Sequence, residues 1–94
     1  MMVAGQYTFR EFYIPDYMME GLALYIEKGI EPGGFLSAVI CNNLSEAVGR
    51  ADDTNIRNIP AYCSYLYNEA PSDCWGSPEA MAEYMKRKRA ESAA

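Results

Sequence analysis

The sequence predicts an all-α fold: a single small domain of about four helices, preceded by an extended N-terminal arm. Apolar residues recur every three or four positions along most of the chain, which is typical of helices that bury one face. Residues that start and end helices separate these stretches. The chain has 94 residues, of which 50% are hydrophobic, and this suffices for one domain and one core over residues 1–94.

The extended arm is predicted over residues 1–13, because aromatic residues occur there without a helix-capping residue. A short strand over residues 6–12 would alternate its side chains and place three of them on one side: Tyr7, Phe9 and Glu11. The arm would either pair with that of a second subunit or cover the core of its own chain.

A first helix is predicted to begin at Ile14-Pro15-Asp16. Proline suits a first turn because a backbone N–H there has no acceptor within the helix, so proline loses no hydrogen bond. An early carboxylate suits the positive end of the helix. Gly29 ends the helix, since positive φ costs glycine little. The buried stripe is predicted to be Met18, Leu22, Tyr25 and Ile26.

A second helical stretch runs from about residue 35 to residue 50. Asn42-Asn43 interrupts it with two poor helix formers, so the sequence predicts either a bend or a split into two short helices. The apolar residues that keep helical period are Leu36, Ile40, Leu44, Ala47, Val48 and Ala51.

A third helix follows the corner Asp52-Asp53-Thr54-Asn55, which is rich in capping residues. Pro60 either starts this helix or kinks it, because its ring removes one backbone hydrogen bond. The buried side is predicted to hold Ile56, Ile59, Cys63, Leu66 and Ala70.

The last helix has a strong start signal, with Ser77 as the cap and Pro78 in the first turn, after a loop over residues 70–76. Its buried face would consist of Met81, Tyr84 and Met85. Residues 90–94 are predicted to form a frayed tail.

No set of residues suited to catalysis is found, so the sequence predicts a protein that is not an enzyme. The chain has no histidine, which removes Ser-His pairs, Cys-His pairs and an imidazole base. Cys41, Cys63 and Cys74 fit neither a disulfide framework nor a metal-ligand pattern. Asp52 and Asp53 could hold a hard cation, but their place at a helix start favours capping. We therefore expect reduced thiols, no metal and no cofactor.

The net charge of −5 is unevenly distributed. Residues 1–85 carry 4 basic and 12 acidic side chains, and the run Lys86-Arg87-Lys88-Arg89 follows. An acidic body repels a phosphate backbone, so direct DNA binding is not expected, and the basic run suits the negative end of a helix. No apolar run is long enough to span a membrane, and the N-terminus lacks a signal-peptide pattern. These features predict a cytoplasmic protein.

Polar and planar side chains gather between residues 42 and 77, at predicted helix ends and in loops. Amides recognise base edges, guanidinium groups bind phosphate oxygens, and aromatic rings stack on planar ligands. Arg50 and Arg57 are the only basic residues between Lys28 and Lys86, so an anion has few other partners. The sequence therefore predicts a ligand-binding site made of Asn42, Asn43, Arg50, Asn55, Arg57, Tyr67, Asn68 and Trp75.

Purely structural explanations compete with this prediction. Asn42 and Asn43 would simply break a helix, and Arg50 would neutralise a neighbouring carboxylate. At least one of the tyrosines in residues 62–67 must face the core, because they do not fit one side of a helix. Trp75 would then serve as a hydrophobic lid.

Two groups of phrases resemble small proteins encoded by many bacteriophages and prophages. The first comprises Gly21-Leu22, Tyr25-Ile26-Glu27, Gly29-Ile30-Glu31-Pro32-Gly33-Gly34-Phe35-Leu36, Ala38-Val39, Asn42, Leu44, Glu46-Ala47, Arg50-Ala51-Asp52 and Asn55. The second comprises Ile59-Pro60, Tyr65-Leu66-Tyr67-Asn68, Ala70-Pro71 and Cys74-Trp75-Gly76-Ser77-Pro78-Glu79. Together they cover about residues 14–80. The resemblance implies a phage origin and a place in the host bacterial cytoplasm.

The resemblance also implies a class of behaviour, because small accessory phage proteins without catalytic residues often disarm host immunity. One class binds and sequesters a nucleotide immune signal, such as a cyclic dinucleotide, without cleaving it. Such sponges of the anti-CBASS and anti-Thoeris types are commonly homo-oligomers that hold ligands between subunits. The alternative is an anti-CRISPR-like inhibitor, which blocks a host defence effector by protein contact, often with an acidic face that mimics nucleic acid.

Of these, the sponge is the prediction that the gathered polar and aromatic residues favour, since a core alone does not require them. The acidic body favours the inhibitor instead, because it would slow the capture of an anion. A structural or assembly factor of the virion is the third possibility.

Overall fold

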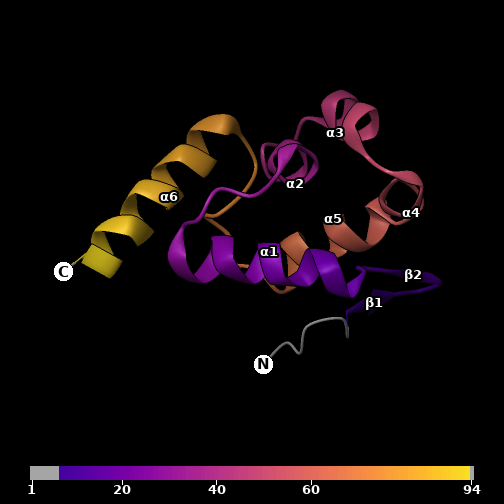
Figure 1. Ribbon diagram of the computed structural model, residues 1–94, viewed down its shortest axis with the longest axis horizontal. Coiled ribbons are helices and arrows are strands. Elements are labelled where there is room, and N and C mark those ends of the chain that lie inside the picture. The colour runs from indigo at the N-terminus through magenta and orange to yellow at the C-terminus, as the bar shows by residue number, and fades with distance from the viewer. Residues whose placement is uncertain (1–6, 94) are drawn as a thin grey trace.

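The computed structural model describes residues 7–93 and shows six helices and one small sheet in that part of the chain (Figure 1). The strands are β1 (Thr8–Phe9) and β2 (Phe12–Tyr13), and the helices are α1 (Asp16–Lys28), α2 (Gly34–Ile40), α3 (Leu44–Arg50), α4 (Asp53–Arg57), α5 (Ile59–Asn68) and α6 (Pro78–Ala93). The predicted helical character is confirmed. The prediction was wrong in two respects, since the fold is not strictly all-α and has more than four helices.

The N-terminal segment forms a hairpin where a single extended strand was predicted. Arg10 adopts a positive φ of 57° and reverses the chain, so that Thr8 pairs with Tyr13 and Phe9 pairs with Phe12. Residues 1–6 of the predicted arm lie outside the described residues.

The hairpin lies against α5 of its own chain. The Tyr13 N–H donates to Asn58 Oδ1 at 2.9 Å, and the Tyr7 hydroxyl lies 2.5 Å from Ser64 Oγ. The buried Tyr7 ring also meets the Tyr65 ring edge-on, with centroids 5.2 Å apart. These contacts make the hairpin a cover for the core.

Helix α1 begins and ends at the residues that the sequence indicates. It starts after Pro15 and ends at Gly29, which adopts φ 70° and donates its N–H to Tyr25 O. Helix α6 crosses this end of α1, where the Tyr84 hydroxyl donates to Ile26 O at 2.5 Å. Figure 1 shows the result: α1 extends from the hairpin at one end to α6 at the other.

The second helical stretch is split, which was one of the two predicted outcomes. Asn42 adopts φ 62° between α2 and α3, and Asn43 caps α3 by accepting the Glu46 N–H at 3.2 Å. Most of α2 is buried and forms the centre of the core. However, only part of the predicted apolar stripe is buried. Within α3, Ala47 is buried, whereas Leu44 and Val48 are exposed.

The third helix is also divided, into α4 and α5, and Pro60 lies in the first turn of α5. The predicted buried side is confirmed in part: Leu66 is buried and Ile59 and Ala70 are half-buried against the core, but Ile56 and Cys63 are exposed. The break at Asn58 shifts the helical phase, and Tyr62 finds a buried hydrogen-bond partner in Asn55. The buried residues of α5 are Ala61, Tyr62, Ser64, Tyr65 and Leu66.

Helix α6 begins at the predicted cap, where Ser77 Oγ accepts the Ala80 N–H at 3.0 Å. Met81 and Tyr84 are buried and Met85 is half-buried, as the sequence indicates. The helix continues to Ala93, through most of the tail for which fraying was predicted. Among the described residues, no helix has the length and apolar character needed to cross a membrane.

Candidate functional site

Two of the eight predicted ligand-binding residues, Asn43 and Arg50, line one hollow between α2 and α3. The hollow has a volume of about 380 Å³ and also contains Glu31 and Glu46. Arg50 Nε lies 3.1 Å from Glu46 Oε2, so the guanidinium already has a carboxylate partner. The Asn43 carbonyl caps α3. This hollow therefore holds more negative than positive charge and is poorly suited to a phosphate.

Asn55 is a structural residue. Only 4% of it is exposed, and its Oδ1 accepts the Tyr62 hydroxyl at 2.6 Å inside the protein. The Asn55 N–H donates to Asp52 Oδ1 at 2.7 Å and completes the cap of α4. Burial raises the pKa of Tyr62, which keeps its hydroxyl protonated as a donor. A ligand outside the core cannot reach this amide.

The remaining polar candidates lie apart from Arg50. Arg57 lines a separate hollow of about 240 Å³ beside the hairpin. Asn68 donates to Ser64 Oγ at 3.3 Å, and Trp75 is half-buried against the core. Tyr67 is 78% exposed on α5. The structure therefore disperses these residues and does not gather them into one receptacle.

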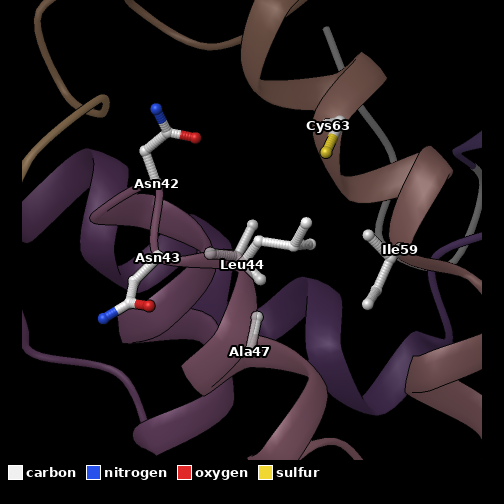
Figure 2. Close-up of a pocket in the computed structure, with 7 residues that line it drawn as sticks. Asn42, Asn43, Leu44, Ala47, Ile59 and Cys63 are labelled. Carbon is white, nitrogen blue, oxygen red and sulfur yellow. The ribbon is translucent and has the colours of Figure 1, made fainter.

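Asn42 lines a third hollow, in the groove between α3 and α5 (Figure 2). Its volume is only about 40 Å³, whereas pockets for small molecules typically measure ~300 Å³ or more. Its lining is largely apolar and consists of Val39, Asn42, Asn43, Leu44, Ala47, Ile59 and Cys63. Sequence reasoning missed this surface, because helical periodicity assigned Leu44, Ile59 and Cys63 to the core.

The basic run near the C-terminus is largely engaged within the chain. Arg87 pairs with Asp73 at 2.8 Å, and Lys88 pairs with Glu91 at 3.3 Å. Arg89 Nε donates to Gly29 O at the end of α1. Arg87 and Arg89 therefore link α6 to the preceding loop and to the end of α1, whereas the Lys88 pair lies within α6. Three of the four cations of this run thus already have partners within the chain.

Acidic side chains dominate the exterior. All thirteen carboxylates are exposed, and ten of them have no ion-pair partner among residues 7–93. Unpaired exposed carboxylates produce a negative potential that attracts cations and basic proteins.

One side of α1 carries both acidic side chains and exposed apolar side chains. Asp16, Glu20 and Glu27 are spaced by four and seven residues, so they lie on one side of the helix. Tyr17, 60% exposed, and Leu24 are beside them. We call these five residues the α1 face. The Tyr17 hydroxyl donates to Asp52 Oδ2 at 3.0 Å, which brings the start of α4 and a further carboxylate to the same region.

The three cysteines are free and differ in exposure. Burial raises the pKa of Cys74 to about 11, and removal of water also raises the pKa of Cys63. Neither thiol is therefore an activated nucleophile at neutral pH. Within residues 7–93, no group of three or more Cys, Asp or Glu side chains is arranged to hold a metal ion.

Comparison with protein-family models, curated proteins and solved structures gives no match. The site must therefore be interpreted from its own geometry and charge.

Proposed function

We propose that this chain acts by surface contact with a basic partner protein, as a counter-defence inhibitor of the kind that its resemblance to phage accessory proteins implies. The α1 face would occupy a nucleic-acid-binding surface of a host defence effector. Such surfaces are rich in Lys and Arg, because they must neutralise phosphates. The observation that carries the proposal is that all thirteen carboxylates are exposed and that ten of them have no ion-pair partner among residues 7–93.

The composition of the α1 face suits a protein partner better than a free cation. Protein interfaces commonly place aromatic or aliphatic side chains at the centre and polar groups at the rim. Tyr17 and Leu24 would supply the apolar contact, and the carboxylates of Asp16, Glu20 and Glu27 would surround it. Opposite charges would speed association and orient the complex.

Sequestration of a nucleotide, as a cyclic-dinucleotide sponge, is the weaker candidate. A bound phosphate needs positive charge, and Arg50 and Arg57 line different hollows. None of the three hollows described above gathers more than two of the eight predicted residues. Asn55 is committed to Tyr62.

The proposal is tested by phage plating on bacteria that carry individual nucleic-acid-guided defence effectors and express the chain. We expect the wild-type chain to restore plating against at least one effector. The combined variant Asp16→Lys, Glu20→Lys and Glu27→Lys should lose this effect. The matched control Glu69→Lys, Glu79→Lys and Glu83→Lys changes the net charge equally and should keep it.

Two outcomes would contradict the proposal. One is equal protection by the α1-face variant and the control, which would show that this face is not used. The other is a rise in melting temperature with a cyclic dinucleotide or an ADP-ribose derivative, because a ligand that binds only the folded state stabilises it. That second result would favour the sponge.

A further inference from the structure

Two charge-free stretches of the chain meet at the groove between α3 and α5. Residues 32–45 and 58–68 contain no Asp, Glu, Lys or Arg, although charged residues make up 22% of the sequence. The first stretch supplies most of one wall, and the second supplies Ile59 and Cys63 opposite it. In Figure 2, Leu44 reaches from α3 toward Ile59, and Cys63 points into the same gap.

Large apolar side chains continue this groove along the exterior. Leu44 is 67% exposed and Val48 is also exposed one turn further along α3. On the other wall, Ile59, Cys63 and Tyr67 follow one another at four-residue spacing along α5. We define the groove surface as Asn42, Asn43, Leu44, Val48, Ile59, Cys63 and Tyr67.

We propose that a second copy of this chain docks on the groove surface. In a two-fold contact the same patch faces itself, so each charge near the axis would meet a charge of the same sign. The two copies also repel one another, since each carries a net charge of −5. A contact between copies therefore requires a charge-free patch, and the groove surface provides one.

The polar residues at its edge fit the same occupant. An asparagine amide both donates and accepts hydrogen bonds, so it can pair with its own counterpart across a two-fold axis. Asn42 and the Asn43 amide nitrogen are available for this, since only the Asn43 carbonyl is engaged in capping. A basic partner would instead bind the carboxylates of the α1 face. The groove surface and the α1 face therefore have separate roles.

The dimer should be weak. A standard stable interface involves roughly 20–30 residues on each side, and the groove surface comprises only the seven named residues. We therefore expect association that depends on concentration. The inference is independent of the proposed function, because it rests on a different face.

Sedimentation velocity over a rising concentration series tests the proposal with the full chain. Wild type should shift from monomer to dimer, and Leu44→Asp should remain monomeric. Ile30→Asp is the matched control, because Ile30 is also an exposed apolar residue, lies outside the groove surface and gives the same change in charge. This control should dimerise like wild type, and equal melting temperatures would show that both variants fold.

Cross-linking adds a second readout at Cys63, the exposed thiol. A short bis-maleimide should link two wild-type copies, whereas Cys63→Ser should lose the link and still sediment as a dimer. A wild-type chain that stays monomeric at every concentration would overturn the proposal. Equal loss of dimer in Leu44→Asp and Ile30→Asp would also overturn it.

Discussion

At the scale of single residues, much of the polar chemistry of this chain stabilises the fold. The Tyr62 hydroxyl donates to Asn55 Oδ1, and the Tyr25 hydroxyl donates to the Cys74 carbonyl at 2.6 Å. No buried side-chain nitrogen or oxygen among the described residues lacks a partner. Tyrosine thus supplies both apolar volume and a satisfied hydroxyl to a core of modest size.

Asn55→Ala tests this interpretation. The change leaves the buried Tyr62 hydroxyl without its acceptor, so we expect the free energy of unfolding to fall by about 1–3 kcal/mol. Urea unfolding would measure it. Asn68→Ala is the control, since Asn68 is exposed and its 3.3 Å contact is long; its effect should stay within about 0.5 kcal/mol.

Adding Tyr62→Phe to Asn55→Ala should recover part of the lost stability, because removal of both partners leaves no unsatisfied group. An Asn55→Ala variant as stable as wild type would instead show that this amide is dispensable for the fold. Asn55 would then return to the list of candidate ligand-binding residues.

At the scale of elements, helix ends were predicted well from the sequence, and the faces of α3 and α5 were not. Pro15, Gly29 and Ser77 act locally, through φ, a missing donor or a side-chain cap, so their effect is visible in the sequence. Which side chains of a helix face the core depends on how the helix is rotated about its own axis, that is, on its phase. The breaks at Asn42 and Asn58 changed that phase, and side chains predicted to be buried, such as Leu44, became exposed.

Gly29→Ala tests the junction between α1 and α6. A Cβ at Gly29 would lie 2.9 Å from the Met85 carbonyl oxygen, and the positive φ of 70° is costly for alanine. We expect a loss of more than about 1 kcal/mol in thermal or urea unfolding. Gly49→Ala is the control: it lies within α3 with open space around it, and should stabilise the chain by roughly 0.5–1 kcal/mol. Equal effects in the two variants would contradict the described junction.

At the scale of the whole molecule, the acidic character was evident from the sequence, but its consequence for function was not. The count of charged residues could not show that three of the four C-terminal cations are used inside the chain. Nor could it show that Arg50 and Arg57 line different hollows. The contacts of Arg87 and Arg89 join segments that are distant in the sequence. Together with the separation of Arg50 and Arg57, they shift the balance from capture of an anion toward contact with a basic protein.

The most direct test of the central claim is the dissociation constant of the complex with the effector identified by plating, measured by calorimetry over a range of NaCl concentrations. Between about 0.1 M and 1 M salt the screening length falls from about 10 Å to 3 Å, so a complex that depends on the α1 face should weaken steeply. The Asp16→Lys, Glu20→Lys and Glu27→Lys variant should show no such dependence. A wild-type affinity that is unchanged across this range would contradict the claim that the acidic exterior forms the contact.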